Sequence, residues 1–264
     1  MTAFTGETFA HLTRDWHHLK RQPFNIIFTL VQPLIWLVLF GSLMRDASFG
    51  STQATADAGA AGGDYLRTLA GGILAFTVYG NAMAGGIQML FDKENGFLTR
   101  LLAAPIARSS IVVSRFLYVE LMAVSQTLVI LGVAYFMGVR VETGVLGVLG
   151  ILGFGALVAF GVTCLSLSLA LKLKGHASFF IITGALGLPM MLCSSALKPM
   201  ELITVPWMRA VAWCNPMSWC ANAMRDCVLG TGTLDSFALN GGLLLAFNVV
   251  MLVLSLRVFK RALS

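Results

Sequence analysis

Six runs of mainly apolar residues divide this chain, and each run is long enough to cross a membrane as a helix. The runs lie near residues 24–44, 66–91, 112–137, 145–171, 177–197 and 241–259. A helix needs about 20 apolar residues to cross about 30 Å of hydrocarbon. The runs lack the strand-like alternation of a membrane barrel, so they favour helices. We therefore predict an all-α integral membrane protein with six transmembrane helices in one domain, residues 1–264.

The composition supports a membrane protein over a soluble one. Hydrophobic residues make up 57% of the 264 and charged residues only 11%, with a mean hydropathy of +0.82. A soluble domain has about a quarter of its residues charged. The chain begins without a signal-peptide pattern, because no small-residue cleavage site follows Phe24–Met44. We expect that run to remain as an anchor.

The basic residues predict the orientation of the spans. Twelve of the 18 lysines and arginines fall on the cytoplasmic side if the N-terminus lies there. Positive residues favour the cytoplasmic side, so both termini are predicted to be cytoplasmic in a multi-pass cell-membrane protein. The net charge of +6 then reflects topology and attraction to anionic membrane lipid. We expect no nucleic-acid partner, since no basic stripe with interleaved aromatic residues is present.

An amphipathic helix is predicted at the interface before the first span, over residues 1–23. Phe9, Leu12, Trp16 and Leu19 recur at helical spacing between charged residues, and Pro23 ends the pattern. Tryptophan is common at the membrane–water boundary. This segment should therefore lie on the membrane surface.

The segment 92–111, between the second and third runs, is unusually charged for a loop between membrane helices. Its apolar residues are spaced as one face of a short helix, which suits a surface that receives a soluble partner. The alternative is that its charges are only solvated loop residues. We predict that it is a cytoplasmic coupling loop, with these docking residues: Asp92, Lys93, Glu94, Phe97, Arg100 and Leu101.

The segment 198–240 is predicted to lie outside the cell and to contain two short helices. Pro206-Trp207 and Asn215-Pro216 divide apolar pieces of about 10 to 13 residues, which are too short to span. One interpretation is a pair of re-entrant helices, and the other is an extracellular loop anchored by tryptophan. We favour the re-entrant helices.

Polar residues within the apolar runs are candidates for a translocation path. They are Gln32, Asn81, Gln88, Glu120 and Gln126. Glu120 is notable because an acidic side chain in hydrocarbon costs about 2.5 kcal/mol or more on insertion scales. It either lines the path or pairs with Arg115 or Lys93, and the sequence leaves both open. Small-residue pairs, among them Gly71-Gly72 and Gly85-Gly86, predict close helix approach.

The sequence carries no recognisable pattern for catalysis or metal binding. No G-x-x-x-x-G-K-[ST] phosphate loop occurs, so the chain is not expected to bind ATP itself. The four histidines have no partner motif, so neither an enzyme nor a metal site is predicted. Cysteines 214, 220 and 227 are expected to be buried free thiols, with a bridge between Cys214 and Cys220 as the alternative.

The whole chain resembles the membrane subunit, or permease, of type-2 ABC exporters, in particular the daunorubicin-exporter-like group. The resemblance rests on the N-terminal amphipathic helix, the six runs and these marks: Gly96, Leu101-Leu102, Pro105, Arg108, Pro206-Trp207 and Asn215-Pro216. It implies two cytoplasmic ATPase subunits, which would bind ATP and Mg, and a second permease copy or close homologue. It also implies re-entrant helices after the fifth span, and an inner-membrane location in a Gram-negative source.

The expected function is therefore ATP-driven export of an amphipathic drug-like or lipid-like molecule. A polysaccharide or glycolipid exporter of the same family is the alternative. Functions of other classes are a channel or scaffold, and a membrane-embedded enzyme acting on lipids. A channel or scaffold would not need the charged segment 92–111, and an enzyme would need a catalytic cluster.

Overall fold

Helices make up the regular structure in the part of the chain that the structure describes. The computed structural model describes residues 30–40, 58–96, 108–173 and 175–262, and no strand occurs within those ranges. The all-α prediction is confirmed there. The predicted interfacial helix, residues 1–23, and the middle of the predicted coupling loop, 97–107, lie outside the described residues.

Four long helices carry segments that are apolar and long enough to cross a membrane. They are α4 (Ala58–Glu94), α6 (Arg108–Phe136), α7 (Gly144–Lys172) and α11 (Leu234–Ala262). Their candidate spans are Leu66–Glu94, Phe116–Phe136, Gly144–Lys172 and Leu234–Phe259. These correspond to the second, third, fourth and sixth predicted runs.

The other two predicted spans correspond to shorter apolar helices. The first run is described only from residue 30 to 40, as a helical segment that begins at Leu30 and continues as the π-helix η1 (Trp36–Phe40). The fifth is α8 (His176–Leu192), with 17 residues. The described residues thus support four spans by length and composition, and six remain a prediction.

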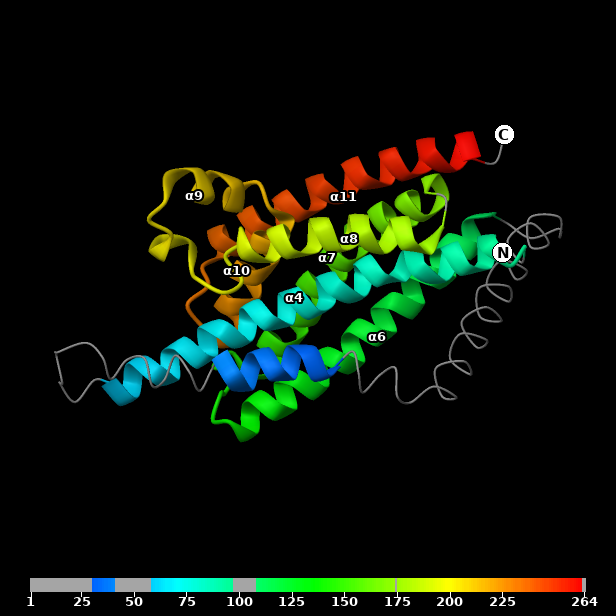
Figure 1. Ribbon diagram of the computed structural model, residues 1–264. Helices are drawn as coiled ribbons and strands as arrows, with labels where there is room; N and C mark the ends of the chain where they lie inside the picture. The colour runs from blue at the N-terminus through cyan, green and yellow to red at the C-terminus, as the bar shows by residue number, and fades with distance from the viewer. Residues whose placement is uncertain (1–29, 41–57, 97–107, 174, 263–264) are drawn as a thin grey trace.

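The long helices alternate in direction, which gives the bundle two distinct ends (Figure 1). One end of the bundle, here called the Glu94 end, carries the last residues of α4, α7 and α11 and the first residues of α6 and α8. The opposite end carries η3 (Met200–Leu202), α9 (Pro206–Trp213) and α10 (Pro216–Leu229), and is called the Asn215 end.

The helix α7 is the centre of the bundle, because it packs against α4, α6, α10 and α11. Its sequence is apolar on every side, as expected for a membrane span that packs on several neighbouring helices. Gly86 lets α4 approach it closely: the Gly86 N–H donates to Ser166 Oγ at 3.0 Å, and a Cβ at Gly86 would lie 2.5 Å from the Ser166 carbonyl oxygen. The predicted small-residue contact at Gly85-Gly86 is confirmed.

The short helix α10 is buried among α4, α7 and α11 rather than lying on the surface. Gly71 makes room for it, because a Cβ there would lie 2.8 Å from the Arg225 Cα. The predicted short helices within 198–240 are therefore observed as α9 and α10. Their depth in a membrane remains a prediction.

Three predicted boundaries are wrong. The last helix begins at Leu234, so residues 234–240 belong to it rather than to the loop, and α4 begins at Ala58 rather than at residue 66. The fifth helix ends at Leu192 instead of 197. It ends there because the Ser195 backbone N–H is bound by Ser218 Oγ of α10 at 3.0 Å, so the chain turns away from the helix.

Candidate transport groove and coupling end

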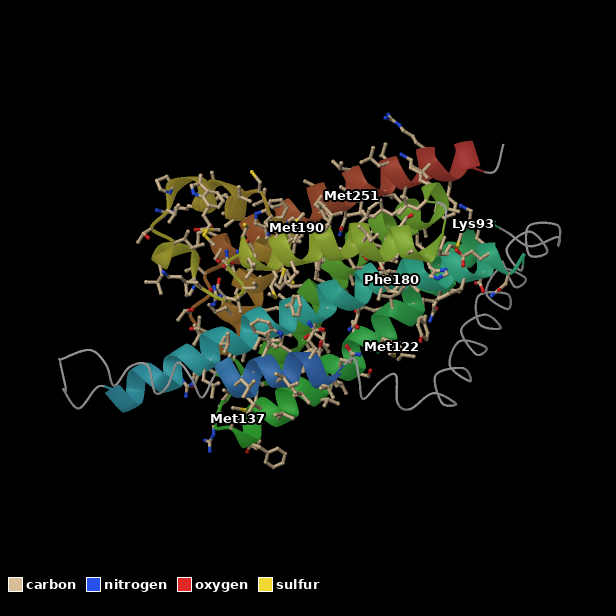
Figure 2. The ribbon with its side chains drawn as sticks, in the orientation of Figure 1. Lys93, Met122, Met137, Phe180, Met190 and Met251 are labelled. Carbon is tan, nitrogen blue, oxygen red and sulfur yellow. The ribbon has the colours of Figure 1, made fainter. Side chains whose placement is uncertain are left out.

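A groove of about 300 Å³ lies between the segment that begins at Leu30, α4 and α8. Figure 2 marks Phe180, which contributes to it from α8. Glycines keep it open, since a Cβ at Gly80, Gly184 or Gly187 would meet no atom within 4 Å. The lining residues are Gln32, Phe76, Tyr79, Gly80, Met83, Ala84, Ile87, Phe180, Thr183, Gly184, Gly187 and Leu188.

The walls of this groove are mainly apolar, with a few polar side chains. Gln32 and Tyr79 bring an amide and a phenol, whereas the Thr183 hydroxyl donates to the Phe179 carbonyl of its own helix at 2.8 Å. An apolar surface with a few polar groups suits an amphipathic molecule. We did not predict Tyr79 or Thr183. The spacing of Phe180, Gly184 and Gly187 along one face of α8 was the available signal.

Of the predicted path residues, Gln32 alone lines this groove. Asn81 Nδ2 donates to Gln126 Oε1, so these two residues join α4 to α6. Gln88 is half-buried on α4 and makes polar contacts of its own. The structure therefore separates residues that the sequence analysis had grouped together.

Glu120 is half-buried on α6 and is not among the lining residues of the groove. Its Oε2 is enclosed and has no hydrogen-bond partner among the described residues. The predicted pair with Lys93 is not formed, because Lys93 binds backbone carbonyls of α7 and its C-cap. The side chain of Arg115 is not among those that the structure describes.

The Glu94 end of α4 is bound to the turn that joins α7 to α8. Lys93 Nζ donates to the carbonyls of Leu171 and Leu173, at 2.7 and 3.2 Å. Glu94 Oε1 accepts from the His176 backbone N–H at 3.1 Å, and Glu94 Oε2 lies 3.1 Å from His176 Nδ1. A cation thus lies at a helix C-terminus and an anion at a helix N-terminus, as the helix dipoles favour.

A ring contact adds to this junction, since Phe91 stacks on His176 with ring centroids 5.8 Å apart. Asp92 is half-buried and also makes polar contacts. The other predicted docking residues, Phe97, Arg100 and Leu101, lie outside the described residues. The predicted coupling loop therefore begins at a point where three helices are already joined.

The residues Asn215 and Pro216 position the start of α10. Asn215 Oδ1 accepts from the Met217 N–H at 3.0 Å, which caps the helix, and Pro216 occupies a first-turn position. Asn215 Nδ2 also donates to the Met190 carbonyl at 2.7 Å, which joins α10 to the end of α8. Figure 2 marks Met190 on α8.

The other predicted pair, Pro206-Trp207, starts α9 in a different environment. Pro206 is at the first turn and is exposed, and Trp207 is 64% exposed. A tryptophan this open lies in a position to contact lipid or solvent. Pro216 therefore starts a buried helix, α10, whereas Pro206 starts an exposed one, α9.

Arg225 on α10 is a buried charge that the sequence analysis placed among the outer loop residues. Its Nη2 donates to the Ser195 carbonyl at 2.6 Å, its Nε to the Thr68 carbonyl at 3.3 Å, and its Nη1 to Asn222 Oδ1 at 3.2 Å. These bonds join α4, α10 and the turn after α8. An arginine in a helix otherwise rich in small residues was the signal.

The cysteines of the described part are free thiols. Cys214 is exposed, whereas Cys220 and Cys227 are buried on α10. The alternative bridge between Cys214 and Cys220 is not formed. No group of three or more potential metal ligands occurs among the described residues.

Comparison with known proteins places most of this chain in one family. Residues 6–229 match the family described as "ABC-2 type transporter". Three curated relatives bear the name "Putative transport permease ycf38". The protein from Porphyra purpurea is 34% identical over 223 residues, or 83% of this chain and 72% of its own length. Those from Pyropia yezoensis and Cyanophora paradoxa are 32% and 30% identical, over 83% and 84% of this chain and 72% and 74% of their own lengths.

Proposed function

This chain belongs to the ABC-2 type transporter family, and from that premise we propose that it is the membrane subunit of an ATP-driven exporter. As a family member it is a transport permease rather than an enzyme. In this proposal, separate cytoplasmic ATPase subunits bind ATP and Mg and supply the energy. The cargo is an amphipathic drug-like or lipid-like molecule, as in the daunorubicin-exporter-like group.

The groove between the segment that begins at Leu30, α4 and α8 is the observation that carries this proposal. Its apolar walls and the few polar groups at Gln32 and Tyr79 match a molecule with an apolar body and a polar part. Its side along α8 is open, since Phe180, Ile181 and Leu188 are 50%, 71% and 62% exposed. We propose that a second permease copy faces this side and completes the path.

The proposed orientation places the Glu94 end in the cytoplasm, with both termini, six spans, and α9 and α10 on the outer side as re-entrant helices. The predicted docking residues then lie where an ATPase subunit can reach them. Lys93 and Glu94 have a second role in this scheme. They bind the α7–α8 turn, so a force on segment 92–111 moves α4 and the start of α8 together.

This coupling needs a rigid element that has two arrangements. The helix α4 fits that need, because it extends from the Glu94 end to the Asn215 end and lines the groove on the way. A shift of α4 against α8 would change the width of the groove. ATP binding by the partner subunits would thereby alternate access to the cargo.

A pull-down in mild detergent from native membrane tests this proposal. The expected result is a stoichiometric ATPase that co-purifies with the permease and hydrolyses ATP. A partnerless oligomer without hydrolysis would instead favour a channel or scaffold. The groove is tested with Gly184→Leu, which fills open space in it, against Gly132→Leu, which fills open space on α6. Export of a fluorescent amphipathic dye should fall in the first variant alone, with the ATPase still bound in both.

A further inference from the structure

A second cavity, of about 460 Å³, lies at the Asn215 end and shares no lining residue with the groove. Its walls come from α4, α10, α11 and the segments around Met200 and Trp213. The volume is within the range of about 300–1,000 Å³ that is usual for ligand sites. Two tryptophans, Trp213 and Trp219, lie beside polar side chains in its wall.

Two polar side chains of this wall, Asp226 and Asn240, each use only one of their two polar atoms in a bond to the protein. Asp226 Oδ2 accepts from Ser236 Oγ at 2.5 Å, and Asn240 Nδ2 donates to the Ser236 carbonyl at 3.0 Å. Asn240 is only 7% exposed, and no described residue donates to its Oδ1. Asp226 Oδ1 likewise has no donor among the described residues. The cavity thus presents an amide and a carboxylate oxygen that can accept from a ligand.

Asn222, another residue of the wall, adds a donor. Asn222 Oδ1 accepts from Ser195 Oγ at 2.7 Å and from Arg225 Nη1 at 3.2 Å. Because the amide oxygen is used in this way, the Nδ2 group of Asn222, which has no acceptor among the described residues, is left for a ligand. The wall therefore offers both donors and acceptors within one cavity.

The charges in the wall decide which class of ligand fits. Arg225 and Asp226 are the two charged residues among its described lining residues, and their formal charges cancel. The guanidinium of Arg225 is directed to the Ser195 and Thr68 carbonyls, and the adjacent carboxylate would repel a phosphate. The same guanidinium would repel an amine. A neutral ligand with many hydroxyl groups meets neither penalty.

We infer that this cavity binds a sugar ring. A pyranose has hydroxyl groups that both donate and accept, and these match the amide of Asn222, the amide oxygen of Asn240 and the carboxylate of Asp226. Its C–H face is apolar, and a tryptophan ring supplies a flat apolar surface of similar size. The inference goes beyond the proposed function, because it adds a ligand site away from the transport groove.

The test is a binding titration on the purified full-length permease in a polyoxyethylene detergent, since glucoside and maltoside detergents carry sugar headgroups. The probes are methyl glucoside, methyl galactoside and methyl N-acetylglucosaminide. Their binding is measured by saturation-transfer difference NMR. A second arm uses nanodiscs with and without glucosyl diacylglycerol. Binding in the first arm identifies a free sugar, and binding in the second alone identifies a sugar carried by a lipid.

The matched variants are Trp213→Leu and Trp207→Leu, since both side chains are at least half exposed and only the first lines the cavity. Trp213→Leu and Asn240→Leu should weaken binding by about tenfold, as the loss of one good contact implies, and Trp207→Leu should not change it. The inference is overturned if neither glycosides nor glycolipid bind, or if the two tryptophan variants behave alike. Neither arm uses an ATPase, so this failure would leave the export proposal standing.

Discussion

Lys93 Nζ lies 2.7 Å from the carbonyl oxygen of Leu171, so a side chain at the end of α4 caps the end of a different helix, α7. Helix C-termini leave carbonyls without partners, and a lysine there satisfies them and interacts favourably with the dipole. The bond therefore joins two helices, α4 and α7, whose bonded residues are far apart in the sequence.

Replacing Lys93 by Met should destabilise this junction. Loss of a hydrogen bond to a charged donor costs about 1.5–3 kcal/mol. Thermal unfolding of the purified permease measures the change, and Lys172→Met, at an exposed position of the same junction, is the control. An equal loss in both variants would argue against a specific capping role for Lys93.

Reversal of charge at the predicted docking residues should abolish ATPase stimulation. The double variant Glu94→Lys with Arg100→Glu is expected to insert and assemble but not to stimulate a partner ATPase. Because Glu94 also binds His176, the variant His176→Ala separates the two roles. Stimulation that survives His176→Ala supports direct docking, whereas an equal loss would assign the effect to the α7–α8 turn.

Two glycines on α4 should differ sharply in their tolerance of alanine. A Cβ at Gly72 would lie 1.7 Å from the Ala196 carbonyl oxygen, whereas a Cβ at Gly80 would meet nothing within 4 Å. Gly72→Ala should therefore reduce the yield of folded permease, and Gly80→Ala should not. Size-exclusion chromatography of both variants measures this, and a well-folded Gly72→Ala protein would contradict the packing at that contact.

Asn215→Ala should destabilise α10. The change removes an N-cap, which is worth about 1 kcal/mol, and leaves the Met190 carbonyl without its partner. The expected result is a lower unfolding temperature, with Asn95→Ala at an exposed position as the control. Unchanged stability would show that packing alone holds the start of α10.

Glu120→Gln is expected to leave the permease assembled, because Glu120 Oε2 has no partner among the described residues to lose. A fall in dye export with normal assembly would support a role for Glu120 in transport. Normal export would leave Glu120 as a structural residue. Reconstituted vesicles provide both measurements from one preparation.

The fourth span shows how much of the fold is predictable from the pattern. Residues 145–171 were expected and Gly144–Lys172 is observed. A long apolar run in a membrane forms a helix because only a helix satisfies all backbone hydrogen bonds within one segment. The fifth was expected to end at 197 and ends at Leu192. No local signal marks that end, since it depends on Ser218 of α10, and a contact across 23 residues cannot be read from composition.

The candidate site was also predictable only in part. Gln32 was expected to line a path and lines the groove, but Asn81 and Gln126, expected beside it, bind one another. Polarity identifies residues that need partners in an apolar medium, and it does not say which partner each finds.

The sequence by itself determined the class of protein, since runs of apolar residues and the lack of other backbone solutions in lipid leave only membrane helices. It also favoured short helices over a loop in the segment after the fifth run. The tertiary structure alone decided that α10 is buried, that Arg225 is bonded inside the bundle and that Lys93 caps α7. These depend on which surfaces meet, and glycines at the contacts allow backbones to approach within distances that no pattern along one helix specifies.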